Sequence, residues 1–239
     1  MKSTILMLLA TLLHGCSGAG TDPTSSTSGD TGGTSSSSTG SSSGGTGQFK
    51  LEAWADNWFS MSIGDKLVVE DSVPITTERS FNSETALFDA GYPMTLSFVL
   101  KDFKQDDTGL EYIGTDKQQI GDGGFIAQIT DTKTGSVVAV SSAAWKCKVI
   151  HKAPTNPACE KDPDPEATCL SEIADEPSGW RNAGYDVSAW ASATEYTAAA
   201  VGPKEGYNDI TWNLAAKLIW TSDLKLDNTL LCKVTIESP

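Results

Sequence analysis

The sequence predicts an all-β protein, an antiparallel β-sandwich or jelly roll whose irregular loops are held by disulfides. Many short segments alternate apolar and polar residues between turn signals, whereas long segments with helical periodicity are absent. The second half of the chain also carries an even number of cysteines, which is typical of a disulfide framework in an exported protein.

A β-hairpin is predicted near the start of the folded region. Residues 58–63 alternate bulky and small side chains from Phe59 on, Gly64 and Asp65 supply a turn, and residues 66–69 return. This pattern indicates two paired strands with one buried face.

Residues 92–103 predict the clearest strand, because four apolar side chains share one face: Met94, Leu96, Phe98 and Leu100. Residues 86–88 predict a weaker strand. A second hairpin is expected where residues 125–129 and 137–140 flank a Thr-Gly turn, and residues 145–150 form another alternating segment.

The last third of the chain gives a mixed pattern. Residues 153–175 hold four of the ten prolines and are expected to be irregular. Residues 215–220 and 230–236 read as buried strands, and residues 188–200 give a weak helical pattern.

The N-terminus predicts export. Residues 1–15 combine Lys2 with a nine-residue apolar run from Ile5 to Leu13 and a small residue before Cys16. This run is too short to cross a bilayer as a helix, which takes about 20 residues. It is therefore expected to direct export and then to be removed.

The residues Leu13-His14-Gly15-Cys16 resemble the bacterial lipobox, in which the cysteine is lipidated and becomes the new N-terminus. The resemblance implies a lipoprotein anchored through acyl chains on Cys16, and more than one chain gives stable anchoring. Because Ser17 is not Asp, it also implies sorting to the outer membrane or cell surface of a bacterium. The alternative is an ordinary signal peptide cut near Gly18 or Gly20, with Cys16 lost.

Residues 16–47 are expected to be a disordered tether. Of the 31 residues from Ser17 to Gly47, 27 are Ser, Thr or Gly. Such a segment has too few apolar groups to offset the entropy lost when a chain becomes ordered. Such a coil spans roughly 30 Å, and a glycosylated stalk is the alternative. Residues 48–239 are then one domain, long enough for a substantial core.

Charge and cysteines narrow the function classes. The formal net charge of −14 makes nucleic acid an unsuitable partner. Four cysteines remain beyond Cys16, and three pairings are open. We favour Cys159–Cys169, which closes a short proline-containing loop, and Cys147–Cys232, which ties a middle strand to the last one. Zinc is the competing interpretation, but the sequence has no C-x-x-C.

Three patches resemble the galactose-binding-like jelly rolls that accompany rhamnosidases and other glycoside hydrolases as non-catalytic domains. They are residues 55–65 (ADNWFSMSIGD), 180–190 (WRNAGYDVSAW) and 216–220 (AKLIW). Two departures from the family's motifs are Val187, where a second Asp is usual, and Gly64-Asp65, where Asn-Gly is usual. The resemblance implies the sandwich fold and permits carbohydrate binding.

Carbohydrate sites combine flat aromatic faces with a few polar groups. The ligand-binding candidates by this criterion are Trp54, Asp56, Trp180, Arg181, Tyr185, Asp186 and Trp190. Core packing is the competing interpretation for the three tryptophans among them. The other four are expected in the core: Trp58, Trp145, Trp212 and Trp220.

Catalysis and metal binding find little support in the sequence. His151 is the only histidine after the signal segment, and we expect it at the surface; a nucleophile in a G-x-S-x-G motif is absent. Asp162, Asp164 and Glu166 alternate as in a calcium loop, but Ala167 stands where that loop needs glycine. We expect no catalytic residues and no cofactor; a structural calcium elsewhere stays open but cannot be placed.

The expected function is therefore a non-catalytic, lipid-anchored, extracytoplasmic β-sandwich module that binds carbohydrate or another surface ligand. One alternative is a structural or adhesive envelope protein that contacts other proteins, and a second is an unrecognised hydrolase.

The lipid anchor is directly testable. Cys16→Ser is expected to abolish labelling of the chain by radioactive palmitate and to release the protein from membranes, because the acyl chains attach only at that thiol. A wild-type protein that is already soluble in the medium would contradict the anchor.

Overall fold

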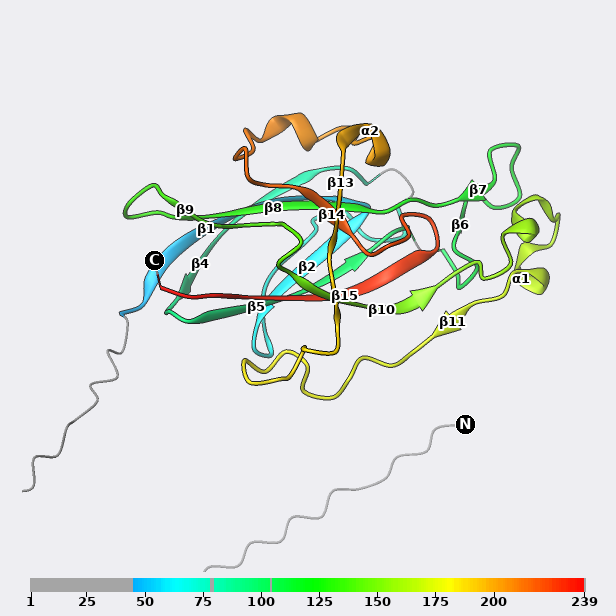
Figure 1. The fold of residues 1–239 in the computed structure, drawn as a ribbon. Coiled ribbons are helices and arrows are strands. Elements are labelled where there is room, and N and C mark those ends of the chain that lie inside the picture. Colours follow the sequence, from blue (N-terminus) through cyan, green and yellow to red (C-terminus); the bar gives the residue numbers. More distant parts are fainter. Residues whose placement is uncertain (1–44, 78–79, 104, 239) are drawn as a thin grey trace, which may run out of the picture. The chain divides into compact units, whose positions relative to one another are not determined.

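The computed structural model describes residues 45–77, 80–103 and 105–238. In this part the chain forms two antiparallel β-sheets that face each other, which confirms the predicted all-β sandwich (Figure 1). Cys16 and tether residues 16–44 lie outside the described part. None of the described helices is long and apolar enough to cross a membrane.

Sheet A has the strand order β13-β14-β8-β1-β4 among the described residues, with β9 also paired to β8. The bounds are Thr194–Tyr196 (β13), Leu218–Trp220 (β14), Gly124–Asp131 (β8), Gly47–Asp56 (β1), Ser83–Ala90 (β4) and Val137–Val140 (β9). The long strand β1 pairs antiparallel with β4 on one side and with β8 on the other.

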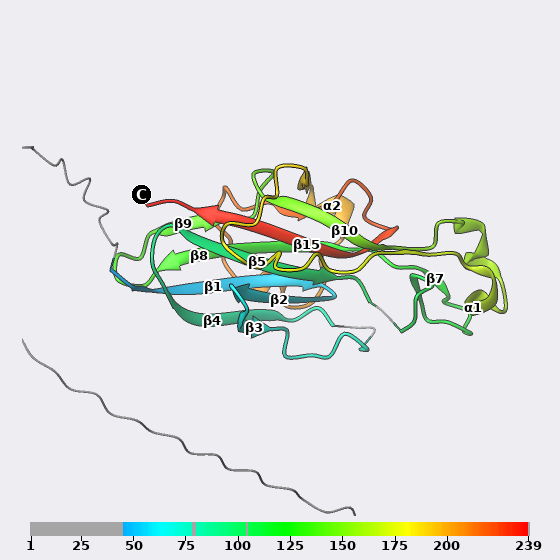
Figure 2. The same cartoon turned by 90° about the horizontal axis from the view of Figure 1, so that it is seen from below.

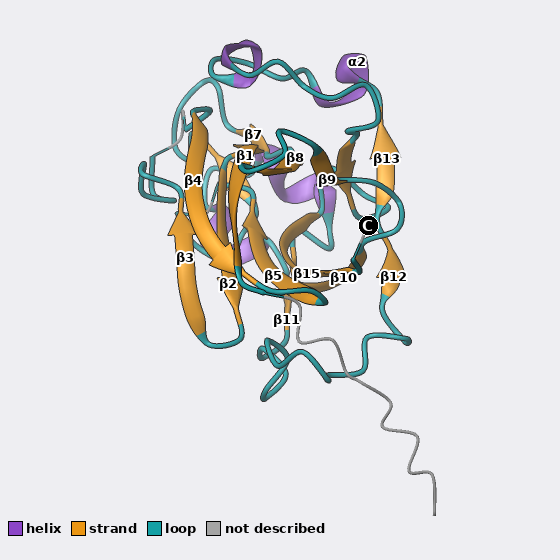
Figure 3. Cartoon of the chain, turned by 90° about the vertical axis from the view of Figure 1, so that its left-hand side faces the viewer, coloured by secondary structure: helices purple, strands orange, loops and turns teal. Residues whose placement is uncertain are grey.

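Sheet B has the order β11-β10-β15-β5-β2-β3 in the described part of the chain, and β12 also pairs with β10. The bounds are Glu172–Ile173 (β11), Lys146–Lys152 (β10), Asp227–Ile236 (β15), Met94–Lys101 (β5), Trp58–Ile63 (β2), Lys66–Glu70 (β3) and Ala191–Ser192 (β12). Viewed end-on in Figure 3, β3 and β4 lie at one side of the sandwich and β12 and β13 at the other.

The main core fills the space between the sheets. Alternate residues of β5 and β8 point inward, among them Phe98 and Phe125, whose ring centroids are 5.5 Å apart. Trp145 joins them at 4.7 Å from Phe98, and its indole N–H donates to the carbonyl of Val140 at 3.0 Å. This aromatic cluster fixes the facing strands against each other.

A loop of residues 176–190, here called strap B, covers the outer face of sheet B (Figure 1, the yellow segment below β5 and β15). Its Trp180 and Trp190 pack on Val99 of β5 and Leu231 of β15. The ammonium group of buried Lys233, also on that face, donates to the carbonyls of Trp180 and Asn182. The central strands of sheet B are therefore buried on both faces.

Residues 197–217, here called strap A, cover the outer face of sheet A in the same way (Figure 1, the orange segment at the top). Strap A contains the short helices α2 (Ala198–Val201) and η2 (Tyr207–Asp209). It encloses Trp54, whose indole N–H donates to the carbonyls of Phe81 at 2.8 Å and Glu205 at 3.0 Å. A buried indole thus ties the strap to β1.

The four cysteines pair as predicted. Cys147 and Cys232 are directly opposite each other on β10 and β15, so this disulfide joins two neighbouring strands inside the core. Cys159–Cys169 joins the short helices η1 (Pro157–Lys161) and α1 (Pro165–Thr168). Figures 1 and 2 place α1 beyond the end of the sandwich strands, near the small hairpin of β6 (Leu110–Glu111) and β7 (Gln119–Ile120).

Most predicted strands are present, with three differences. The weak helical pattern at 188–200 was wrong for most of its length, because it contains β12, β13 and only the start of α2. The strand expected from residue 215 begins at Leu218, since the residues before it close strap A. Strand β1 was not predicted, although its core residues Phe49, Leu51, Ala53 and Ala55 alternate with outward residues of which Trp54 alone is apolar.

Removing the two disulfides is expected to have unequal effects. The chain separations are 85 residues for Cys147–Cys232 and 10 for Cys159–Cys169. In the loop-entropy account, replacing both cysteines of a pair by alanine lowers the unfolding free energy by about 4.5 kcal/mol for the first and about 3 kcal/mol for the second. Urea denaturation of the two double variants measures this, and a larger loss for Cys159→Ala with Cys169→Ala would contradict it.

Candidate functional site

The structure places the three candidate tryptophans in the interior. Trp54, Trp180 and Trp190 are 0%, 2% and 8% exposed. Trp54 lies under strap A, whereas Trp180 and Trp190 lie beneath strap B with their ring centroids 6.0 Å apart. The three side chains therefore pack in the interior, as the competing interpretation expected. None of them offers an exposed ring face to a ligand.

The polar candidates on strap B serve the strap itself. Arg181 pairs with Glu176 at 2.8 Å and stacks over the Trp180 ring at 4.6 Å. Tyr185 packs against Trp190. The Asp186 carboxylate accepts a hydrogen bond from the backbone N–H of Ser188 at 2.8 Å, which lowers its pKa. Each of these contacts fixes the path of the loop.

Asp56, the remaining candidate, lies apart from strap B at the end of β1. It belongs to an acidic cluster with buried Asp102 and Glu111 and partly exposed Asp122. Burial raises the pKa of Asp56 to about 8 despite the nearby Lys204. Burial, reinforced by the charges of Glu111 and Asp56, raises the pKa of Asp102 well above its usual range. The Asp102 carboxylate fits because position 121 is glycine. Any other residue there would have a Cβ atom that collides with the carboxylate.

Lys204 of strap A supplies a positive charge to this acidic cluster. Its ammonium lies 3.4 Å from Asp56 Oδ2 and 3.9 Å from Asp122 Oδ1. Burial by itself would lower the pKa of Lys204, but the negative charges of Asp56 and Asp122 have the larger effect. The pKa of Lys204 is therefore raised above its ordinary value. Among the described residues, no group of three or more His, Cys, Asp or Glu side chains is arranged to hold a metal ion. The cluster thus links strap A to the end of β1.

One of the hollows among the described residues lies along the outer edge of β10. Strand β12 pairs with β10 at residues 146–147, and β11 pairs with it at residues 151–152. Between them the sheet edge opens into two adjoining hollows of about 340 and 250 Å³, which share Val149, Ser222 and Asp227. We call this the β10 groove.

The β10 groove combines apolar walls with a small set of polar groups. Ile150 and Ile173 line the larger hollow, and Trp190 and Ala191 line the smaller one. The polar lining includes Lys148, Lys152, Glu172, Ser192, Thr194 and Thr221. Such a mixture is typical of small-molecule and sugar sites.

Asp227 lies at the junction of the two hollows and is the most deeply placed charge in the β10 groove. Its Oδ2 accepts a hydrogen bond from the Thr221 hydroxyl at 2.6 Å, and its Oδ1 lies 3.9 Å from the Lys152 ammonium. Its backbone carbonyl accepts from the Trp220 indole at 2.7 Å, which anchors the position. A buried carboxylate beside a partly exposed lysine presents an acceptor and a donor side by side.

His151 is buried, which corrects the expected surface position. Cys147 and Val149 face the core, but the pairing of β10 with β15 shifts register on both sides of His151, so a simple two-residue alternation does not extend to it. Its Nε2 lies 3.2 Å from the carbonyl oxygen of Asp107.

No local pattern in the sequence marks the β10 groove. Its lining residues come from β10, β11, the end of strap B, β12, β13, the loop after β14, and β15, so they meet only once both sheets have formed. Asp227 is preceded in the chain by ordinary turn residues, and no motif marks it. Of the predicted candidates, only Trp190 lies at this groove.

Asp56 gives the stability a pH dependence whose sign follows from its raised pKa. Because the folded value of about 8 exceeds the ordinary 3.8, its stabilising contribution is complete below about pH 4 and is lost as the pH rises towards 8. Over that interval the wild type loses stability with pH and Asp56→Asn does not. The unfolding free energy of the variant is therefore expected to rise by roughly 1 kcal/mol per pH unit relative to that of the wild type. Urea denaturation across this range measures the difference, and a difference independent of pH would contradict the raised pKa.

The chain matches no protein-family model, and searches of curated proteins and of solved structures found no match. What the protein binds is therefore inferred from its residues and their geometry.

Proposed function

We propose that the protein is a non-catalytic, lipid-anchored module that displays its β-sandwich outside the cytoplasm and binds a carbohydrate in the β10 groove. The lipobox-like residues ending at Cys16 and the Ser/Thr/Gly tether support the anchoring. The two disulfides are typical of an oxidising compartment.

The observation that carries the binding proposal is Asp227 at the floor shared by the two hollows. A carboxylate accepts hydrogen bonds only, and Oδ2 already has Thr221 as its donor. Lys152, whose side chain is 40% exposed, supplies a donor beside Oδ1. Adjacent hydroxyl groups of a sugar ring both donate and accept, so they match this pair. Trp190, Ala189 and Ala191 supply apolar lining beside it.

Charge favours a neutral glycan. Among the residues lining the groove, Lys148 and Lys152 are balanced by Glu172 and Asp227. The chain as a whole carries −14. A polyanionic glycan would be repelled by the protein and would find no excess positive charge in the groove.

A second candidate function, a structural or adhesive envelope protein that contacts other proteins, is favoured by a different observation. The burial of Trp54, Trp180 and Trp190 removes the aromatic platforms that many carbohydrate-binding surfaces use. In that case the straps serve only to complete the fold.

Lys152→Ala tests the binding proposal. In the soluble full chain carrying Cys16→Ser, this change is expected to weaken binding to a neutral polysaccharide about tenfold, because one charge-assisted hydrogen bond is lost. Affinity gel electrophoresis on a panel of neutral and acidic polysaccharides measures the retardation.

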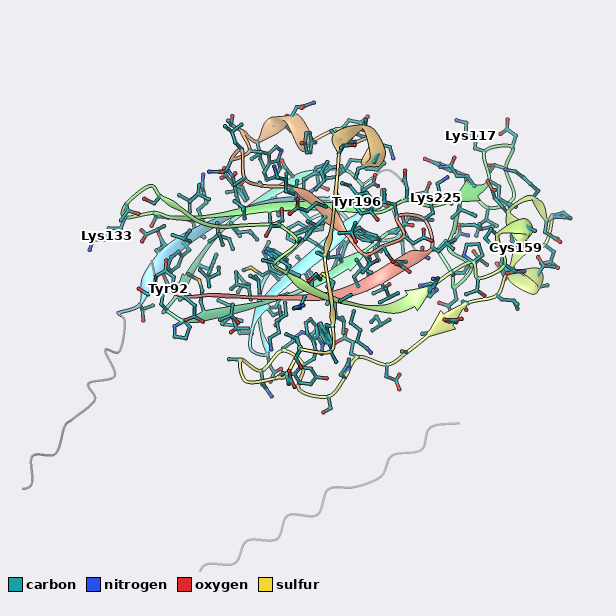
Figure 4. All side chains as sticks on the ribbon, in the orientation of Figure 1. Tyr92, Lys117, Lys133, Cys159, Tyr196 and Lys225 are labelled. Carbon is teal, nitrogen blue, oxygen red and sulfur yellow. A yellow bond between two sulfur atoms is a disulfide. The ribbon has the colours of Figure 1, made fainter. Side chains whose placement is uncertain are left out.

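Lys133→Ala is the matched control. Lys133 lies at the turn between β8 and β9, at the far end of the sandwich from β11 (Figure 4), and its removal is expected to leave retardation unchanged. Equal loss in both variants would contradict the β10 groove as the site. Absence of retardation on every polysaccharide would contradict carbohydrate binding itself.

A further inference from the structure

A second groove lies on the opposite side of the sandwich, where β3 and β4 form the edges of the two sheets (Figure 3). It has a volume of about 250 Å³. Its lining residues are Ile63, Lys66, Leu67, Val68, Leu87, Phe88 and Asp89. We call it the β3/β4 groove.

The rims of the β3/β4 groove are apolar side chains that remain in water. Leu67 is 50% exposed and Leu87 is 61% exposed. Between them, Phe88 is buried and Val68 is half-buried against the main core. Two exposed leucines flanking an apolar floor provide a place where a partner's apolar side chain would lose its contact with water.

Both strands that border this groove have a free hydrogen-bonding edge. Within the described residues, β4 pairs only with β1, and β3 pairs only with β2. Strand β4 has eight residues, long enough to template an added strand. The loop that connects β3 to β4 contacts the other end of β4, where the Ser72 N–H donates to Glu84 at 2.9 Å.

The charge around the β3/β4 groove distinguishes between two kinds of occupant, a second copy of this chain and a basic segment of another protein. The exposed acids Asp65 and Glu70 lie at the two ends of β3, and Asp89 lies in the groove lining together with Lys66, the single basic residue there. A second copy of this chain would bring a net charge of −14 to an acidic edge. A basic segment would instead be attracted to it.

We propose that the β3/β4 groove is a docking surface for an extended, basic segment of another protein. The segment adds to β4 as a further strand, places an apolar side chain between Leu67 and Leu87, and directs lysine or arginine side chains toward Asp89 and its acidic neighbours. This surface is separate from the β10 groove and does not depend on carbohydrate binding.

The probe is a fluorescently labelled seven-residue peptide in which lysine alternates with leucine, titrated with the Cys16→Ser chain and followed by fluorescence anisotropy. A peptide with glutamate in place of lysine controls for charge, and a lysine peptide with a central proline controls for strand addition. We expect saturable binding of the first peptide alone, with slowed amide exchange in residues 83–90.

Leu87→Ser is expected to weaken this binding about tenfold, the loss typical of an anchor residue. Leu214→Ser is the matched control, because Leu214 is a fully exposed leucine on strap A, and it is expected to bind like the wild type. Both leucines are exposed, so the variants should fold, and circular dichroism verifies it.

Three results would overturn the proposal. The first is equal binding of the lysine and glutamate peptides, and the second is unchanged binding in Leu87→Ser. The third is a concentration-dependent dimer in sedimentation that Leu87→Ser abolishes, which would assign the groove to a second copy of the chain.

Discussion

The fold depends on covering both faces of both sheets. An antiparallel sheet commonly packs one face on the core and leaves the other in water. Here β5 and β15 are buried nearly throughout, because strap B lies over the outer face of sheet B. Strap A does the same for sheet A and buries Trp54. The tryptophans that resemble ligand platforms in the sequence are thus the contacts that attach these loops.

This coverage determines where the molecule is left to bind anything. With the faces occupied, hollows remain at the sides, where sheet edges meet loops or each other. The β10 groove has a buried carboxylate and a partly exposed lysine, the pair on which the proposal of a small hydroxylated ligand depends. The β3/β4 groove has exposed leucines and free strand edges, and it suits a peptide. The two sides therefore differ in chemistry because they differ in what borders them.

The sequence predicted those parts of the fold that depend on local periodicity. The alternation in β5 and the Thr-Gly turn between β8 and β9 are local patterns, and both elements are present. The burial of the outer face of β5 could not be predicted from its sequence. Thr95 and Ser97 alternate with the core residues and are of the type found on exposed strand faces, yet both are buried. Asp227 could not be identified, since its significance arises from segments that are far apart in the chain.

Hydrogen exchange of the tryptophan indole N–H groups, followed by NMR, tests most directly whether the straps are integral to the fold. The Trp54 indole donates beneath strap A to the carbonyl of Phe81, and the indole of buried Trp180 donates to the carboxylate of Glu176 on strap B itself. The account predicts that they exchange as slowly as the backbone amides of β5, through global unfolding only. Exchange many times faster than those amides would mean that the straps open on their own, and that the faces beneath them are available to a ligand after all.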